Sequence, residues 1–438
     1  MGRPLLKYDQ VAAWCDSTDQ KMTKLHSEWL VSNRTFYSGM KLLTGNSRLV
    51  NDGGKHNIQQ MEVECPCCHK TRFVRATLLN PANKNCMQST LCASCNNRTT
   101  QVFREIETGV SETYVNGYQV LLDTDDVPKL QGMSIQVQTR YGHPYAVAVT
   151  FIDNKRRTQQ ISRLVLGVTN PKIMVDHINH NTLDDTKQNL REVKPVQNSA
   201  NTGIKNTNQT GFKNIHLCAR DTKWVVQCKS YNITKRFQLF PEAYRFWKEN
   251  VQRRQGEHAY SLLQDSTIHK QIAGLIIDDI ANGPGIGCTI FLQGCSHHCE
   301  SCQSPHTWDF DGGAQFTQQS WDSIVDYCRA KPYIDHLTLS GGDPLDSLTL
   351  TNFIVSEFKY MFPTKSIWVY TGYTYEEIAN EKRFWPLLET VDVLVDGPFQ
   401  KDLKDLSLAW RGSSNQRVID VQKTIQNGGN VVLWEGTT

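Results

Sequence analysis

Residues 291–303 read FLQGCSHHCESCQ, and their three cysteines, Cys295, Cys299 and Cys302, follow an apolar run typical of a strand. A cube of four irons and four sulfides that is held by three thiolates keeps one iron open to an exogenous ligand. The stretch therefore predicts a reactive 4Fe-4S cluster. Two other interpretations stay open, namely a zinc site completed by either histidine of the stretch, and ordinary loop cysteines.

The surrounding segment alternates apolar runs with polar stretches long enough for a helix. The apolar runs are IAGLIIDDI, CTIFLQG, HLTLSGGD, SIWVYTGY and VDVLVDG. Buried strands that alternate with helices are typical of a parallel sheet. We therefore expect an α/β domain over residues 271–438.

Five motifs of this segment are NGPGIGCTIFLQGCSHHCESC, LTLSGGDPL, IWVYTGY, DVLVDGPF and LAWRGSSNQR. In this order they resemble the radical S-adenosylmethionine enzymes, and specifically the activating proteins of anaerobic ribonucleoside-triphosphate reductases. The resemblance covers about residues 271–420. It implies a partial (β/α) barrel, cluster ligation by Cys295, Cys299 and Cys302, and S-adenosylmethionine on the open iron.

The resemblance also implies where the cofactor lies. Gly341 and Gly342 would allow close backbone approach after a strand, and Asp343 is expected near the methionine ammonium. Ser301 and Gln303 are further expected cofactor contacts. The implied reaction is one-electron cleavage of the sulfonium, followed by hydrogen abstraction from a glycine Cα of the reductase large subunit, with reduced flavodoxin as electron donor.

Two further places in this segment are candidate contacts. Asp396 and Gly397, and residues 411–415, could meet the partner's loop or the cofactor; a strand end and a turn are the alternative. Cys288 and Cys328 lie outside the cluster motif and are expected to be buried apolar residues.

Charge divides the chain. Residues 1–268 hold 35 Lys and Arg against 23 Asp and Glu, a net charge of +12, whereas residues 269–438 hold 12 against 21, a net charge of −9. A basic segment suits a phosphate backbone through counterion release, and an acidic one does not. The two parts are therefore expected to meet different partners, although solvated faces would also account for the charges.

The middle of the chain carries a second motif, VDHINHNTLDDTKQNLREVKPVQNSANTG, at residues 175–203. It resembles the HNH endonucleases of homing type, which fold as a ββα-metal unit. The resemblance implies that Asp176 and Asn198 hold a divalent cation such as Mg²⁺, that His177 is the general base, and that Asn189 braces the loop. One departure is Asp184-Asp185, where the family has Asp-Asn.

The following segment, TGFKNIHLCARDTKWVVQCKSYNITKRFQLFPEAYRFWKENVQRRQGEHA, resembles the three-stranded sheet plus helix that contacts double-stranded DNA in many such enzymes. Trp224 is expected to pack beneath the helix that bears Trp247. The side chains expected to face phosphates are Lys213, Lys223, Lys229, Lys235 and Arg236.

Near the N-terminus, Cys65, Cys68, Cys92 and Cys95 form two C-x2-C pairs. Paired knuckles of this kind predict a structural zinc ribbon, with unmetallated buried cysteines as the alternative. Cys67, His69 and Cys86 are spare donors. The expected organisation is residues 1–60 unassigned, 61–100 zinc-ribbon-like, 110–205 nuclease-like, 206–265 DNA-binding and 271–438 activase.

Length and composition agree with a multidomain protein. A chain of 438 residues exceeds one ordinary core, and 14 cysteines in two main clusters suit a reducing interior. No signal-like or membrane-spanning stretch stands out, so we expect a cytoplasmic protein. Since no methionine lies between Met174 and Met361, a standard start codon could not give the complete activase alone, which favours an in-frame fusion.

The expected function is therefore a glycyl-radical activase fused to an endonuclease-like region. A homing endonuclease that carries the activase as attached cargo is the first alternative. A nuclease region that has decayed and only binds DNA is the second.

Overall fold

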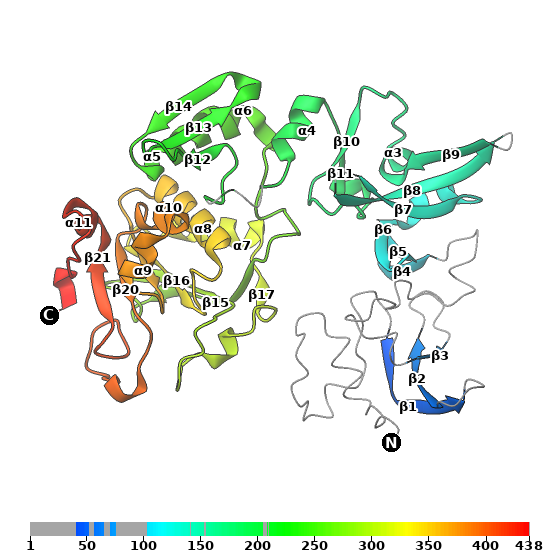
Figure 1. Cartoon of the computed structure of the whole chain (residues 1–438). Helices are drawn as coiled ribbons and strands as arrows, with labels where there is room; N and C mark the ends of the chain where they lie inside the picture. The colour runs from blue at the N-terminus through cyan, green and yellow to red at the C-terminus, as the bar shows by residue number, and fades with distance from the viewer. Residues whose placement is uncertain are drawn as a thin grey trace. The chain divides into compact units, whose positions relative to one another are not determined.

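The computed structural model describes residues 41–51, 57–64, 71–75, 103–140, 142–152, 155–204, 208 and 210–437. The chain divides into two compact units, residues 1–194 and 195–438 (Figure 1). The four cysteines of the expected zinc ribbon lie outside the described residues, as do residues 1–40. The boundary between the two units, at residues 194 and 195, falls within the expected nuclease segment of residues 110–205.

The described part of the first unit consists of antiparallel β-structure with short helices. Its strands form three three-stranded sheets, β1-β2-β3, β4-β5-β6 and β7-β8-β9, and the hairpin β10-β11. The strands are β1 Lys41–Asn51, β2 Asn57–Glu64, β3 Thr71–Arg75, β4 Arg104–Glu107, β5 Val110–Val115, β6 Tyr118–Asp123, β7 Ser134–Arg140, β8 His143–Ile152, β9 Lys155–Gln160, β10 Met174–His177 and β11 Leu190–Val193. The helices are η3 Thr124–Leu130, α3 Ile161–Val165 and η4 Lys187–Asn189.

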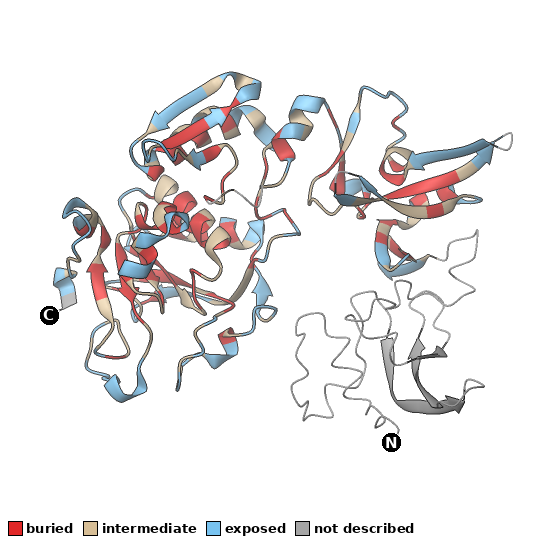
Figure 2. Cartoon of the chain, in the orientation of Figure 1, coloured by how far each residue is buried: buried red, intermediate tan, exposed pale blue. Residues whose placement is uncertain are grey.

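One apolar core joins the elements around the hairpin. Val120 and Leu122 of β6, Ile135 of β7, Ile161 of α3 and Leu190 of β11 belong to it. The core places the hairpin, and with it the Asp176-His177 pair, against a packed framework. Figure 2 shows the buried stretch along β8.

The second unit is organised around a seven-stranded sheet of order β17-β15-β16-β18-β19-β20-β21. Its strands are β15 Gln271–Asp279, β16 Gly287–Leu292, β17 Ala314–Gln315, β18 His336–Gly341, β19 Ser366–Tyr370, β20 Val393–Asp396 and β21 Arg417–Asp420. Strands β16, β18, β19 and β20 are parallel, whereas β15, β17 and β21 pair antiparallel. The predicted parallel sheet is therefore confirmed, with antiparallel strands at both edges.

Helices that connect the strands or follow the last one cover one face of this sheet. They are α7 Gln318–Ala330, α8 Leu348–Met361, α9 Tyr375–Asn380, α10 Trp385–Leu388 and α11 Val421–Gln426. Thr317 and Thr374 begin α7 and α9 with reciprocal capping boxes, which satisfy backbone N–H groups that a helix start leaves free. The core holds Leu339, Ile354 and Val369, together with the buried Cys288 and Cys328, as expected.

A smaller sheet of order β12-β13-β14 belongs to the same unit. Its strands are β12 Ile215–Leu217, β13 Trp224–Cys228 and β14 Ile233–Phe237, and it is accompanied by α4 Pro195–Asn201, η5 Lys229–Tyr231, α5 Phe240–Trp247, η6 Lys248–Gln252, α6 Arg253–Gln255 and η7 Gly256–His258. Trp224 and Trp247 lie in one aromatic core between this sheet and α5. The predicted sheet plus helix is confirmed as a fold.

The remaining short 3-10 helices of the second unit are η8 Pro305–Thr307, η9 Lys382–Phe384, η10 Lys401–Leu403 and η11 Glu435–Thr437. In the part of the chain that the structure describes, no helix is both long and apolar enough to span a membrane.

Candidate functional site

The three cysteines of the opening motif lie on the loop that leaves the carboxyl end of β16. Cys295, Cys299 and Cys302 are free and partly exposed. His298 and Ser301 adopt φ angles of 47° and 59°, and these left-handed residues turn the loop back on itself. The backbone N–H of Ser304 donates to Cys302 Sγ at 3.3 Å. Ser301 and Gln303 are exposed on the same loop.

This donor set fits an iron–sulfur cluster. Cysteine sulfur is the ligand such clusters use, and N–H groups directed at the sulfur tune them. Burial raises the pKa of the Cys295 thiol to about 11, so a cation would be needed to hold it as thiolate. Within the described ranges, however, no three His, Cys, Asp or Glu side chains are drawn together in a metal-binding group.

Gly341 and Gly342 lie where the next parallel strand, β18, ends. A Cβ on Gly341 would sit 2.6 Å from the carbonyl oxygen of Leu292, and one on Gly342 would sit 2.2 Å from that of Gly294. The Gly342 N–H donates to the Leu292 carbonyl at 2.8 Å. The two glycines are therefore required for the close approach between this turn and the start of the cysteine loop.

Asp343 follows these glycines and is only 1% exposed. Its carboxylate accepts hydrogen bonds from the Thr371 hydroxyl at 2.9 Å and from the Gly372 N–H at 2.8 Å. His297 Nε2 lies 2.9 Å from the same carboxylate, and Asp343 is the leading cause of the raised pKa of His297. Asp343 thus joins the ends of β18 and β19 to the cysteine loop. Its expected contact with the methionine ammonium stays a prediction.

Asp346 makes a second tie that the sequence did not suggest. It accepts from the Ser296 N–H at 2.7 Å, from the Ser296 hydroxyl at 2.8 Å and from the Tyr373 hydroxyl at 3.0 Å. The spacing of three residues after Asp343 in GGDPLD is the only signal that could have indicated it. Together Asp343 and Asp346 tie the cysteine loop to the turn after β18 and to the segment after β19.

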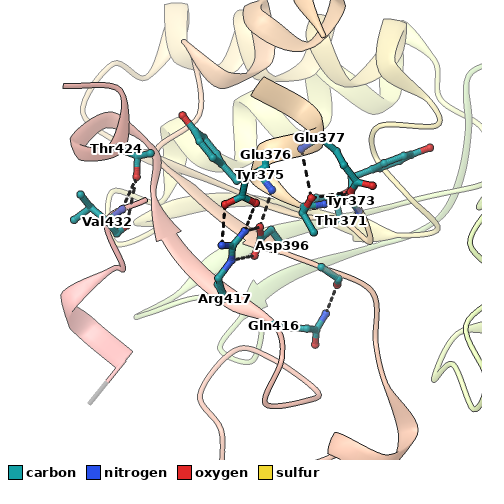
Figure 3. A network of polar contacts seen from close by, with 12 residues as sticks. Thr371, Tyr373, Tyr375, Glu376, Glu377, Asp396, Gln416, Arg417, Thr424 and Val432 are labelled. Carbon is teal, nitrogen blue, oxygen red and sulfur yellow. Dashed lines mark hydrogen bonds and ion pairs between the residues drawn. The ribbon is translucent and has the colours of Figure 1, made fainter. Parts of the chain in front are cut away.

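Asp396 and Gly397 lie at the carboxyl end of β20, where Arg417 of β21 organises a charged network (Figure 3). Arg417 Nε donates to Asp396 at 3.0 Å, and its two terminal nitrogens donate to Glu376 of α9 at 3.0 and 2.7 Å. The buried Asp396 also accepts from the Tyr375 N–H at 2.7 Å. Asp396 therefore has a structural role, because its carboxylate accepts hydrogen bonds from both β21 and α9.

In the first unit, Asp176 and His177 end strand β10. His177 is 6% exposed, and its Nε2 lies 3.1 Å from Asp185 Oδ1, a carboxylate that is 1% exposed. Burial raises the pKa of Asp185. Arg191 Nε donates to Asp176 Oδ2 at 2.9 Å. The residue that departs from the family pattern is thus the one that contacts the expected general base.

Asn189 braces the intervening loop, as expected. Its Nδ2 donates to the Asp184 carbonyl at 2.8 Å and its Oδ1 accepts from the Asn179 N–H at 2.9 Å. Asn198 lies in α4, which belongs to the second unit, so a shared cation with Asp176 stays a prediction.

Among the five basic residues expected to face phosphates, Lys229, Lys235 and Arg236 are exposed. Lys235 lies over the rings of Phe246 and Phe237, and Arg236 pairs with Asp221 at 2.5 Å. Lys223 is partly exposed. Lys213 instead donates to carbonyl oxygens at the end of α4, at Ala200 and Thr202, so it acts as a helix cap.

Comparison with known proteins places the site in a class. Residues 281–419 match the family model described as a 4Fe-4S single cluster domain. The chain therefore contains the domain of a cluster-binding protein over the sheet that carries the cysteine loop.

Relatives narrow this class. The anaerobic ribonucleoside-triphosphate reductase-activating protein of Salmonella typhimurium is 41% identical over 143 residues, which are 32% of this chain and 92% of the relative. Proteins of the same name from Vibrio cholerae and Enterobacteria phage T4 are 40% and 41% identical, over 90% and 87% of their lengths and 32% of this chain. The chain belongs, through its C-terminal part, to the family of anaerobic ribonucleoside-triphosphate reductase-activating proteins.

Proposed function

We propose that residues 271–438 form a radical S-adenosylmethionine activase that installs a glycyl radical on an anaerobic ribonucleoside-triphosphate reductase. The observation that carries the proposal is the pair of aspartate ties between the cysteine loop and the turn after β18. Asp343 and Asp346 hold these two segments together at the carboxyl edge of a parallel sheet, which is where α/β enzymes of this kind bind ligands. The family relationship supports the same role.

The residues divide the work. Cys295, Cys299 and Cys302 would hold a 4Fe-4S cluster and leave one iron for S-adenosylmethionine. When bound, and with an electron from a donor such as reduced flavodoxin, the cluster would supply one-electron cleavage of the sulfonium of S-adenosylmethionine. The turn at Gly341 and Gly342 brings its backbone close to the cysteine loop.

The test is direct transfer to the partner. The reduced, reconstituted chain and S-adenosylmethionine are mixed anaerobically with the reductase large subunit, and the glycyl radical is measured by electron paramagnetic resonance. A radical signal that depends on the cofactor and is absent with Cys295→Ala is expected. A cofactor that is cleaved without any radical on the reductase would sink the proposed target.

A second function is favoured by the contact between His177 and Asp185. A buried carboxylate beside an imidazole orients the ring and sets its tautomer, as a general base requires. With Asp176 and a divalent cation such as Mg²⁺, the His177 site of the first unit would then hydrolyse double-stranded DNA. The chain would in that case be an endonuclease with the activase attached.

The nuclease proposal is tested by Mg²⁺-dependent nicking of supercoiled DNA. The wild type is compared with His177→Ala, and with His180→Ala as a matched histidine of the same motif. We expect nicking to disappear with the first variant. If the wild type binds DNA but leaves it intact, the region only binds DNA.

The zinc ribbon remains a proposal, supported by the spacing of its cysteines alone. Replacing Cys65 by serine should lower the zinc content of the purified chain by about one ion. An unchanged zinc content would remove Cys65 from the ligand set.

A further inference from the structure

Residues 397–416, here called the 397–416 loop, connect the carboxyl end of β20 to β21. The cysteine loop leaves the same edge of the sheet, since β16 and β20 belong to the parallel set. The two loops also touch, because Lys401 Nζ lies 2.8 Å from Glu300 Oε1. Glu300 stands between Cys299 and Cys302. The 397–416 loop therefore borders the proposed reaction site.

Hydrogen bonds and ion pairs of Gln416 and Arg417 hold the base of the 397–416 loop. Gln416 donates through Nε2 to the Gly397 carbonyl at 2.9 Å and accepts from the Gly412 N–H at 2.9 Å. The next residue, Arg417, carries the network with Asp396 and Glu376 described above. A loop anchored in this way can present side chains in one geometry, which lowers the entropic cost of binding.

Trp410 marks a strained position in this loop. Its φ angle is 54°, a conformation that a bulky residue adopts only when its surroundings enforce it. The enforcing contacts are the rings of Trp368 and Trp434, whose centroids lie 5.6 and 5.2 Å away. Backbone strain of this kind clusters at active sites and ligand-binding sites. Arg411 is the next residue.

Three buried polar atoms at this corner have no hydrogen-bond partner among the described residues: Arg411 Nε, Asn415 Oδ1 and Tyr370 Oη. Asn415 Nδ2 is occupied by the Pro398 carbonyl at 2.8 Å, so the side chain is held while its acceptor stays free. An unsatisfied buried polar group is costly and calls for an explanation. A donor, Arg411 Nε, and an acceptor, Asn415 Oδ1, thus lie on the same anchored loop.

A main-chain amide offers the complementary pair. Its N–H suits Asn415 Oδ1 and its carbonyl oxygen suits Arg411 Nε–H. At the outer part of the loop, Leu403 and Leu406 are 41% and 82% exposed. Exposed leucines beside unpaired amide-binding groups suit a polypeptide better than a small cofactor, because only a polypeptide would reach and cover both.

We propose that the 397–416 loop is the docking site for the substrate polypeptide of the reductase. Asn415 and Arg411 bind the main chain of this polypeptide, and Leu406 contacts the apolar side chains of the same polypeptide. This inference rests on the proposed activase function. Asn415 and Arg411 then determine where a substrate glycine lies with respect to the cysteine loop.

The test measures binding and cofactor cleavage separately. The affinity of the reconstituted full-length chain for the reductase large subunit is titrated for the wild type, Asn415→Ala and Leu406→Ser. Leu239→Ser is the matched control, because Leu239 is also exposed, at 46%, and precedes α5 outside the loop. Cleavage of S-adenosylmethionine without reductase is followed in the same samples, with KM for the reductase in radical formation.

Loss of one hydrogen bond at such a site should weaken reductase binding, and raise KM, by about tenfold for Asn415→Ala. Leu406→Ser should act in the same direction, and uncoupled cleavage should stay within about twofold of the wild type. Unchanged affinity in both loop variants would overturn the proposal, as would a parallel loss of uncoupled cleavage, which would assign the loop to the cofactor. A wild type that binds the reductase through this loop yet cleaves no cofactor would instead refute the activase function.

Discussion

Asp343 and Asp185 show how single residues of the two candidate sites are held by contacts from other segments. The sequence indicates Asp343 as a cofactor contact, yet its carboxylate already accepts hydrogen bonds from Thr371 and Gly372 and lies 2.9 Å from His297 Nε2. Motif reasoning could find the residue but not its partners, since these come from loops far apart in the sequence. Asp185 shows the same limit, because a departure from a family pattern becomes the contact of His177.

Asp346 gives the first prediction at this scale. Asp346→Ala removes three hydrogen bonds to Ser296 and Tyr373 and frees the cysteine loop, so a reconstituted cluster should be lost about tenfold faster. Bleaching of the cluster absorbance under chelator measures this rate. Asp402→Ala, an exposed change in η10, is the control, and equal rates in both variants would exclude a role for Asp346.

Asp126 gives a prediction on pH. Burial would raise the pKa of Asp126, but ion pairs with Lys129 and Lys187, both at 2.8 Å, lower it below the ordinary value. A lowered carboxyl pKa stabilises the fold above the unfolded pKa of about 3.9, and this stabilisation is lost as the pH falls through the folded pKa. Asp126→Asn should therefore cost about 1–2 kcal/mol of unfolding free energy at pH 7.

Urea unfolding at pH 7 and at successively lower pH checks this expectation. The difference between wild type and Asp126→Asn should shrink once the pH falls below about 4. A difference that stays constant down to the acid limit would show that the ion pairs do not stabilise the first unit.

At the scale of elements, the small sheet β12-β13-β14 and α5 are joined to the activase helices. Trp224 Nε1 and the Phe240 N–H both donate to Glu389, at 2.8 and 2.5 Å, and Glu357 of α8 accepts from Tyr244 and Lys248. Figure 1 shows α8 and α10 between the small sheet and the large one. The added sheet is therefore part of the second unit.

Sequence patterns predicted the elements but not this arrangement. Alternating apolar runs indicated the parallel strands, and Trp224 with Trp247 indicated the packing of sheet on helix. The boundary drawn between residues 265 and 271 gave no sign that Glu357 and Glu389 would receive donors from across it. Polar contacts at such distances leave no periodic signal in a chain.

Glu389→Ala tests this junction. Two buried donors, Trp224 Nε1 and the Phe240 N–H, would lose their acceptor, so the unfolding free energy of the second unit should fall by about 3 kcal/mol. Chemical denaturation followed by tryptophan fluorescence measures it. Glu381→Ala, an exposed surface change, should leave stability within about 0.5 kcal/mol. If both changes lowered the unfolding free energy equally, the hydrogen bonds to Glu389 would not stabilise the second unit.

At the scale of the whole molecule, the two proposed activities fall on segments of opposite net charge. The net charge of −9 coincides with the segment that matches the activating proteins, whereas the +12 segment carries the motif with His177. If the two are separate, His177→Ala should leave cofactor cleavage within about twofold of the wild type, and Cys299→Ala should leave DNA nicking equally unaffected. Parallel assays of both activities in both variants check this, and reciprocal losses would contradict independence.

The most direct test of the central claim is dithionite-dependent formation of 5′-deoxyadenosine by the full-length chain, reconstituted anaerobically with iron and sulfide. Wild type and Cys218→Ala, a free cysteine outside the motif, should form the product, whereas Cys299→Ala should not. No product from a wild type with a fully assembled cluster would contradict the activase, and equal product from Cys299→Ala would contradict the assigned cluster ligands.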